Sequence, residues 1–364
     1  MQTAKQSVVH VMASTAGGVG RHVQQLAKVF QDDAHFCFRV VGPKALADSF
    51  GPDIHFKVLD ISDHLSPSDA GRILKLRKIL ENQQIVHAHG LRAGAMVGLA
   101  TTFSSRRLRP KVVVTLHNLP VGGAKTQVVS GVLQRIVARR ADAVLGVSQD
   151  LIRQMRGLGV KKTARALVPA PVSTQSELGA DAAVLFANKK FTFLTVARLA
   201  PQKGLDLLLA TAELLAKKNS NFQWLVAGDG PLREELETLS AEKNLPVHFL
   251  GSRTDVSALQ IHSDVIVSTA TWEGQPLALQ EALRYGKPIV ATDAGGTQEV
   301  TRQAAILVPV GDISQLTKAL QEVLDSTELI AEMKEKSQVA AGYLPDEEQV
   351  KKSLHKLYSE LTMN

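Results

Sequence analysis

Short apolar runs rich in β-branched residues alternate with longer segments whose apolar positions recur at helical spacing. In the first half the runs predict strands at 8–12, 36–41, 85–89, 112–117 and 143–147. The segments between them predict helices at 19–30, 70–80, 92–103 and 125–139. Because a strand followed by a helix repeats, the pattern predicts a parallel sheet with helices on both faces.

The same pattern starts again after a stiff link at 168–171, which reads Val-Pro-Ala-Pro. Further strands are predicted at 191–196, 222–226, 247–250, 265–268, 288–291 and 305–308, and further helices at 204–217, 231–243 and 276–285. We therefore expect an α/β protein with two Rossmann-like, doubly wound domains, 1–171 and 172–344. A last amphipathic helix at 346–361, within a tail of 345–364, is expected to pack back on the first domain. Ligands of such folds bind at the carboxyl ends of the strands, which predicts a site in a cleft between the domains.

Composition agrees with a soluble two-domain protein. The chain has 364 residues, of which 45% are hydrophobic, 21% charged and 4% aromatic. So few aromatic residues argue against an RNA-stacking surface. The only cysteine, Cys37, excludes an internal disulfide and is predicted to be buried and inert, because it lies in an apolar run. The polar start and the lack of a long uncharged apolar run predict a cytoplasmic protein, at most associated with the inner face of the membrane.

Charge is distributed unevenly between the two halves. Residues 1–172 contain 24 Lys and Arg against 10 Asp and Glu, whereas residues 173–364 contain 18 against 25. The first half is therefore predicted to meet an anionic surface such as a lipid, an acidic acceptor or a nucleic acid. Uneven drift in surface composition would give the same asymmetry.

Candidate chemistry concentrates around two glutamates that lie eight positions apart, Glu273 and Glu281. Pro276 suits the first turn of a helix, which places Glu273 on the preceding loop and Glu281 inside the helix. Free N–H groups at a helix N-terminus attract a diphosphate, and a neighbouring carboxylate can accept hydrogen bonds from sugar or ribose hydroxyls. An ordinary surface loop and helix would show the same spacing.

A glycine-rich loop between the first predicted strand and helix offers a second contact. Gly17 and Gly18 allow the backbone to approach a ligand closely, and the next helix presents its N-terminus. A tight turn without a ligand would also need these glycines.

The two glutamates resemble the E-x7-E signature of retaining glycosyltransferases of the GT-B fold, in glycosyltransferase family four, and the resemblance extends over nearly the whole chain. Arg198 and Lys203 are similar to the family's R-x4-K pair, and 228–231 to its G-x-G-P turn. His117 resembles the family histidine that reaches the donor sugar. His87 and His89 fit the pattern too, either as scaffold or as residues on the acceptor side.

The resemblance implies transfer of a hexose-type sugar from a nucleotide diphosphate donor, with a UDP-sugar favoured over a GDP-sugar. It assigns catalysis to Glu273, His117, Arg198 and Lys203, whose cations would stabilise the charge that grows on the leaving diphosphate. The positions that it assigns to the donor are Gly17, Gly18, Arg198, Lys203, Gly228, Ser252, Arg253, Gln275, Pro276, Leu277, Ala278 and Glu281.

Two departures from the family pattern affect these expectations. Many members have E-G-F-G, whereas this chain has Gln275 and Pro276 after the first glutamate and glycine. Since proline lacks an N–H, phosphate contacts should come from the amides of Leu277 and Ala278. No Asp-x-Asp motif occurs, so we expect neither metal nor cofactor. The resemblance implies retention at the anomeric carbon, and no carboxylate stands out as a nucleophile, so we expect a same-face displacement in which the leaving diphosphate takes the acceptor's proton.

The acceptor is expected to be a saccharide or glycolipid, in particular a lipid-linked saccharide of cell-envelope polysaccharide synthesis. The predicted helices 71–80 and 125–140 combine apolar positions with Lys and Arg, and the loop 106–111 is basic. Such elements suit peripheral contact with an anionic membrane, although they also suit ordinary surface helices.

Three alternatives remain at this stage. A non-hydrolysing nucleotide-sugar epimerase of similar fold would need more acid and base side chains around the sugar. A basic nucleic-acid-binding protein would leave the cleft motifs without a role, so no nucleic-acid partner is expected. A nucleotide-sugar sensor without catalysis is disfavoured, since every expected site residue occurs.

Overall fold

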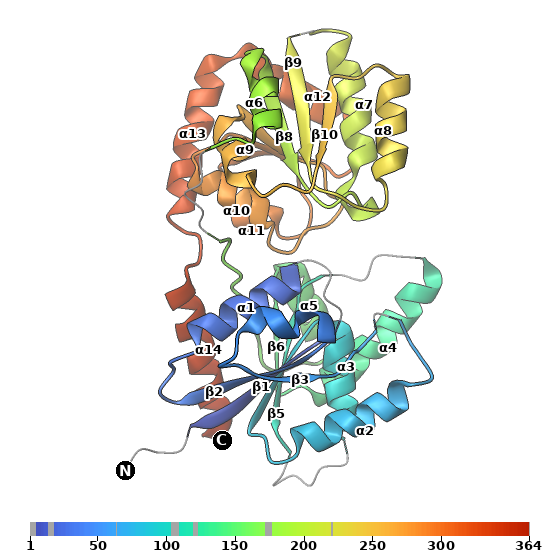
Figure 1. Ribbon diagram of the computed structural model, residues 1–364, viewed down its shortest axis with the longest axis vertical. Coiled ribbons are helices and arrows are strands. Elements are labelled where there is room, and N and C mark those ends of the chain that lie inside the picture. Colours follow the sequence, from blue (N-terminus) through green and yellow to red (C-terminus); the bar gives the residue numbers. More distant parts are fainter. Residues whose placement is uncertain are drawn as a thin grey trace. The chain divides into compact units, whose positions relative to one another are not determined.

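The structure is a computed structural model that describes residues 5–13, 18–62, 64–102, 109–118, 123–171, 177–219 and 221–363. The chain forms two compact units, each with its own parallel sheet (Figure 1). The first unit contains Met1–Val168 and Pro345–Asn364, and the second contains Pro169–Leu344. The predicted α/β architecture of two Rossmann-like domains is confirmed.

The first unit has seven strands in the order β3-β2-β1-β4-β5-β6-β7. Its elements are β1 (Gln6–Met12), α1 (Gly18–Val29), β2 (Phe36–Gly42), the 3-10 helix η1 (Lys44–Phe50), β3 (His55–Val58), α2 (Asp69–Leu80), β4 (Ile85–His89), α3 (Leu91–Ala100), β5 (Lys111–Leu116), α4 (Ala124–Arg140), β6 (Ala143–Gly146), α5 (Gln149–Gly157), β7 (Thr163–Arg165) and α14 (Glu347–Thr362). The order in which strands are added reverses between the parallel neighbours β1 and β4, so the sheet has its topological switch point there.

The second unit has six strands in the order β10-β9-β8-β11-β12-β13, with its switch point between β8 and β11. Its elements are α6 (Ala180–Ala187), β8 (Phe191–Val196), the 3-10 helix η2 (Pro201–Lys203), α7 (Leu205–Ala216), β9 (Phe222–Ala227), α8 (Arg233–Glu242), β10 (Val247–Gly251), α9 (Val256–His262), β11 (Val265–Ser268), α10 (Leu277–Arg284), β12 (Ile289–Thr292), α11 (Thr297–Thr301), β13 (Ala305–Val308), α12 (Ile313–Asp325) and α13 (Thr327–Ala341).

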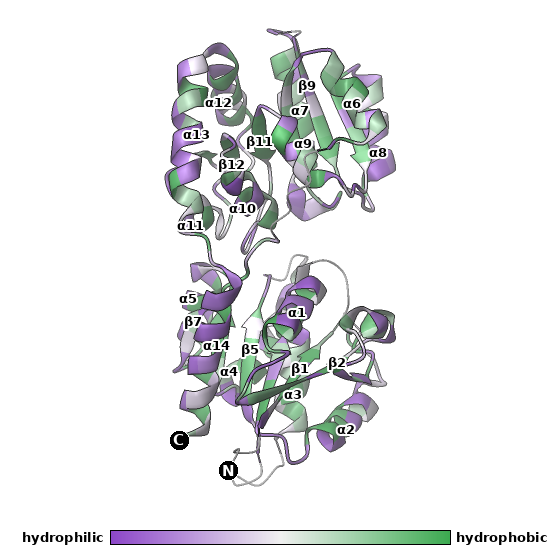
Figure 2. Ribbon diagram, turned by 60° about the vertical axis from the view of Figure 1, so that its left-hand side comes forward, coloured by the Kyte–Doolittle hydropathy of each residue, from purple (hydrophilic) through white to green (hydrophobic). Residues whose placement is uncertain are grey.

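The central strands are buried on both faces because helices cover both faces of each sheet. In β4 every residue is buried, and in β9 every residue is buried as well. Helix α3 is buried nearly all round, whereas α2 buries only Leu76 and Leu80 and directs Arg77 and Lys78 to solvent. Figure 2 shows this difference as mixed hydrophilic and hydrophobic positions on α2.

The carboxyl terminus returns to the first unit through α14, which begins with a capping box at Asp346 and Gln349. Tyr358 is 1% exposed and packs edge-on against Phe36 of β2. Leu354, Leu357 and Leu361 are buried on the same helix. Among the described residues, no helix combines the length and the apolar character that crossing a bilayer requires.

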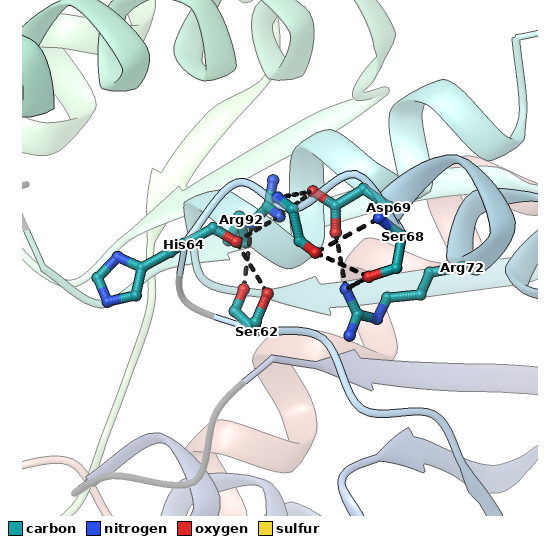
Figure 3. Close-up of polar contacts among 7 residues, drawn as sticks. Ser62, His64, Ser68, Asp69, Arg72 and Arg92 are labelled. Atoms are coloured by element: carbon teal, nitrogen blue, oxygen red, sulfur yellow. Dashed lines mark hydrogen bonds and ion pairs between the residues drawn. The ribbon is translucent and has the colours of Figure 1, made fainter.

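Polar contacts join the first turns of α2 and α3 (Figure 3). Arg92 of α3 forms an ion pair with Asp69 of α2 and donates to the carbonyl oxygens of Ser62 at 3.2 Å and His64 at 3.0 Å. Asp69 also accepts a bond of 3.2 Å from Arg72. Arg92 therefore fixes the loop before α2 beside the carboxyl end of β4.

Two expectations need correction. Cys37 is only partly buried, because it alternates with Phe36 and Phe38 in β2 and shares its face with the partly exposed Arg39. The helix predicted at 92–103 ends at Ala100, where Thr101 returns its hydroxyl to the carbonyl of Val97. Residues 103–108, which include the first part of the basic loop 106–111, lie outside the described residues, as do 172–176, which follow the link at 168–171.

Candidate active site

The residues of the two charged motifs meet in the second unit because their strands are neighbours. Arg198 and Lys203 follow β8, and Glu273 follows β11, so both loops leave the same edge of the sheet at the switch point. Lys203 Nζ forms an ion pair with Glu273 Oε1. Their side chains are 18% and 17% exposed, whereas Arg198 is exposed to solvent.

The backbone around this ion pair is held by its own hydrogen bonds. Thr269 Oγ1 donates to the carbonyl of Lys203 at 2.8 Å, and the Thr271 N–H donates to the carbonyl of Gln202 at 2.9 Å. Gly204 has φ +57°, and a Cβ there would lie 2.2 Å from the Thr269 carbonyl oxygen. Only glycine fits this approach, so Gly204 is what brings the Lys203 loop against the Glu273 loop.

Helix α10 begins directly after the Glu273 loop. Pro276 is the N-cap residue, and the first-turn amides of Leu277 and Ala278 have no acceptor within the helix. The carbonyl of Glu273 itself accepts a hydrogen bond of 2.7 Å from the N–H of Gly296. The loop is therefore fixed while the helix N-terminus stays able to bind an anion.

Glu281 lies one turn further into α10 and is partly buried. Gln260 of α9 donates to Glu281 Oε2 at 3.4 Å and to the Ala278 carbonyl at 3.2 Å. Gln260 thus orients the second glutamate of the signature, a role that nothing in the pattern around Gln260 indicates. Gln275 is also partly buried, in the loop between Glu273 and the helix.

The glycine-rich turn after β9 supports the Arg198 segment. Gly228 has φ +140°, and a Cβ there would lie 1.9 Å from the Ala197 carbonyl oxygen. The Leu199 N–H donates to the carbonyl of Asp229 at 3.0 Å. Gly228 consequently determines the position of Arg198 through backbone packing.

Arg253 is engaged within the protein. Its guanidinium forms ion pairs with Asp181 and Asp255, and its side chain is 12% exposed. Hydrogen bonds from Arg253 lower the pKa of Asp255 to about 2, although burial opposes this shift. Asp255 also accepts a bond of 2.7 Å from the Gly179 N–H. The cluster ties the start of α6 to the Ser252–Arg253 loop.

In the first unit, histidines from three neighbouring strands lie on one face of the sheet. His10 Nδ1 lies 2.9 Å from His89 Nε2, and His89 Nδ1 lies 3.3 Å from His117 Nε2. His87 instead bonds through Nδ1 to the Tyr358 hydroxyl at 2.6 Å and through Nε2 to Thr115 Oγ1 at 2.7 Å. We call His10, His89 and His117 the histidine chain.

Burial keeps these imidazoles neutral. Desolvation, followed by repulsion from His22, lowers the pKa of His10 to about 3. Desolvation alone lowers the pKa of His22 to about 4, and mainly the same cause holds the pKa values of His89 and His117 well below their ordinary value. Neutral rings at pH 7 offer one donor and one acceptor each.

Two groups of potential metal ligands occur among the described residues. One is Asp33, His35 and His355, and the other is His10, His87 and His89, which offer ring nitrogens within 4.8 Å of one another. Each of these rings already uses a nitrogen in a bond with another histidine, Tyr358 or Thr115. No carboxylate belongs to this group of three histidines, so we assign these rings a role in hydrogen bonding.

The structure thus joins Lys203 to Glu273 in the second unit and His117 to His89 in the first. Gly18 is the first residue of α1, and Gly17 lies outside the described residues. Sequence reasoning did not identify His10, because it is a single polar residue in an apolar run, and it gave no role to His22 at the end of the glycine loop. A signal was present only in their positions, in the strand and helix on either side of the glycine loop.

Comparisons with known proteins agree with this arrangement. Residues 17–171 match the model of the glycosyl transferase 4-like domain, and residues 180–340 match that of the glycosyl transferases group 1. An uncharacterized glycosyltransferase of Bacillus subtilis, YqgM, is 23% identical over 320 residues, covering 85% of this chain and 87% of its own.

A second relative is the Escherichia coli UDP-Gal:alpha-D-GlcNAc-diphosphoundecaprenol alpha-1,3-galactosyltransferase. It is 26% identical over 278 residues, which cover 71% of either chain. Among solved structures, Anabaena Alr3699/HepE in complex with UDP shares the fold with a TM-score of 0.79 at 20% identity, covering 98% of this chain and 100% of its own. With both halves matched to glycosyltransferase domains in this order, the chain belongs to the glycosyltransferases of the GT-B fold, of the family-four type.

Proposed function

We propose that the chain transfers a hexose-type sugar, with retention and without a metal ion, from a UDP-sugar to a lipid-linked saccharide or glycolipid. The observation that carries the proposal is the Lys203–Glu273 ion pair at the switch point of the second sheet, next to the start of α10. A cation, a carboxylate and free amides there match the charges and hydroxyls of a nucleotide sugar.

The donor diphosphate would contact Arg198, Lys203 and the amides of Leu277 and Ala278. Since Lys203 and Glu273 neutralise each other before the donor arrives, the diphosphate would replace the carboxylate as the partner of Lys203. Glu273 would then be released to accept hydrogen bonds from the sugar hydroxyls.

The nucleoside would lie further along the same edge. Glu281, oriented by Gln260, would accept from the ribose hydroxyls. Because the side chain of Arg253 is held by two aspartates, the base would be met by the backbone of Ser252 and Arg253. The resemblance assigns Gly17 and Gly18 to the diphosphate and His117 to the sugar, and the proposal includes these residues of the first unit.

In the reaction the bond between the anomeric carbon and the diphosphate oxygen breaks, and a bond to the acceptor oxygen forms on the same face. The acceptor's proton passes to the leaving diphosphate oxygen. Arg198 and Lys203 would stabilise this step, because the negative charge on the diphosphate grows as the sugar departs.

Donor and acceptor classes are supported by the relatives. HepE has been seen with UDP and with UDP-glucose, and the E. coli relative is named for a UDP-galactose donor and a diphosphoundecaprenol-linked acceptor. These findings favour a UDP-sugar and a lipid-linked saccharide for this chain as well.

A lipid-linked acceptor calls for contact with a membrane, which α4 could provide. Val128 and Val132 are 69% and 50% exposed near its N-terminal end, between the exposed cations Lys125 and Arg135. Apolar and basic side chains together favour adsorption to anionic lipid. We expect the protein to sediment with phosphatidylglycerol vesicles at low salt and not with phosphatidylcholine vesicles. Binding to neither kind of vesicle would contradict this part of the proposal.

The donor assignment is tested by a thermal-shift and hydrolysis screen with UDP-, GDP- and ADP-sugars in the presence of EDTA. We expect UDP and one UDP-sugar to raise the melting temperature, and the UDP-sugar to be consumed slowly. NMR of the transferred sugar should show the anomeric configuration of the donor. Stabilisation by no nucleotide, or an epimerised donor without transfer, would contradict the proposal.

A further inference from the structure

The histidine chain can hold its protons in only two orders. Each neutral ring carries one N–H, and each of the two N···N contacts at 2.9 and 3.3 Å needs one proton between its nitrogens. The proton of the middle ring, His89, can occupy only one of the contacts. The hydrogen bonds of both contacts must therefore run in the same direction along the histidine chain.

The two orders differ at the ends of the chain. In one, protons point from His10 toward His117, which leaves the His117 proton on Nδ1 and His10 Nε2 without a proton. In the other, they point from His117 toward His10, which places an N–H at His10 Nε2 and a bare nitrogen at His117 Nδ1.

Burial favours the first order. His10 is 0% exposed, its ring stacks on Phe38 at 3.9 Å, and its Nε2 has no hydrogen-bond partner in the described part of the chain. Buried N–H groups without an acceptor are rare in proteins. The second order would create one at His10, whereas the first leaves an unprotonated acceptor nitrogen there, which is the less rare of the two.

His117 is the end of the histidine chain that lies at the carboxyl edge of the sheet. His10 and His89 are fully buried, while His117 follows the last residue of β5 and is only half-buried. Its single hydrogen bond among the described residues is to His89. Ligands bind at this edge in doubly wound folds, so the remaining nitrogen is available to a substrate.

We propose that His10 and His89 fix His117 in the tautomer with its proton on Nδ1, so that His117 presents a hydrogen-bond donor to the substrate and His89 is a positioning residue for sugar transfer. The role in transfer rests on the proposed function, whereas the tautomer does not. Sugar and phosphate oxygens both accept hydrogen bonds, which makes an N–H the useful group at this position.

NMR of protein labelled with 15N-histidine tests the tautomer directly at pH 7.5. The His117 signals, assigned by their loss in His117→Ala, should show a proton on Nδ1. Substituting His10 by Leu removes the first donor of the histidine chain and should give a mixture of His117 tautomers. His87 makes no hydrogen bond to these three rings, so His87→Leu should leave the His117 proton on Nδ1. A proton on Nε2 of His117 in the unsubstituted protein would overturn the proposal.

Activity tests the positioning role through a matched pair of substitutions. His89→Asn keeps an amide that can donate to His117 Nε2, whereas His89→Leu has a similar volume and no donor. We expect kcat about tenfold lower for His89→Leu and within about threefold of the original for His89→Asn, the effect of one hydrogen bond. In a His117→Ala background the two variants should have the same kcat.

Equal losses for His89→Asn and His89→Leu in the unsubstituted background, or a difference that persists without His117, would overturn the positioning role. If the original chain transfers sugar from no nucleotide donor, the proposed function fails and the role of His89 in it fails too. NMR still decides the tautomer in that case.

Discussion

Lys203 is the residue whose removal tests the donor site most directly, because its side chain pairs with Glu273, the first glutamate of the signature. We expect Lys203→Ala to lower kcat/KM for transfer by about 10²–10³-fold, as removal of a preorganised charge-stabilising group does. Steady-state kinetics with the UDP-sugar found in the screen measure this.

The matched control is Lys243→Ala, which removes a lysine paired with Glu213 on the surface of the same unit. Its kcat/KM should remain near that of the original protein. Comparable transfer by Lys203→Ala and Lys243→Ala would remove Lys203 from the mechanism.

The buried histidines make a second prediction, on the pH dependence of stability. His22 has a pKa near 4 in the folded protein and an ordinary value of 6.5, so the unfolded chain binds the extra proton between these values. The free energy of unfolding is therefore not reduced by His22 above pH 6.5, and it falls as the pH drops toward 4. His10, His87, His89 and His117 act in the same direction.

Urea unfolding followed by circular dichroism at pH 7.5, 6.0 and 5.0 measures this slope. His22→Gln should reduce it by about 1.4 kcal/mol per pH unit, the contribution of one proton. His55→Gln, on the exposed edge strand β3, should leave it unchanged. An identical slope for the original protein and His22→Gln would show that His22 is not held neutral by the fold.

At the scale of the elements, Asp69 of α2 pairs with two arginines, and only Arg92 belongs to the neighbouring helix α3. Arg92 is 12% exposed and makes three contacts, whereas Arg72 is 25% exposed and bonds within its own helix. Arg92→Ala should lower the free energy of unfolding by about 2 kcal/mol, because it leaves Asp69 and two loop carbonyls without this partner.

Arg72→Ala should cost only about 0.5 kcal/mol, as expected for a partly exposed pair one turn apart on a helix. Chemical denaturation of both variants measures the difference. Equal losses would mean that Arg92 does not fix the loop.

Several elements escaped prediction for physical reasons. Strand β7 has three residues, Thr163–Arg165, and acquires its structure by pairing with β6 rather than from its own apolar content. Helix α12 did have a signal, since Asp312 caps it and Leu316, Leu320 and Val323 recur at helical spacing. Central strands rich in apolar and β-branched residues, such as 85–89 and 191–196, were predicted to the residue.

For the whole molecule, the decisive contact is the return of α14 to the first unit. The Tyr358 hydroxyl bonds to His87 at 2.6 Å in the buried core, so Tyr358→Phe should lower the stability of the first unit by about 1–2 kcal/mol. Hydrogen exchange of the β4 amides measures this locally. Tyr343→Phe, at a side chain that is 63% exposed, should change nothing; protection of β4 unaltered by Tyr358→Phe would contradict the prediction.

The sequence by itself determined the α/β class, the repeated strand–helix order and the loops that carry Arg198, Lys203, Glu273 and Glu281. These follow from local periodicity and from turn chemistry, which are properties of neighbouring residues. Only the tertiary structure decided that Lys203 pairs with Glu273 and that Arg253 forms ion pairs with aspartates. It also decided that His10, His89 and His117 are linked in this order by ring-nitrogen contacts. Each of these contacts joins residues from separate elements, and strand order and side-chain direction, which no local pattern encodes, bring them together.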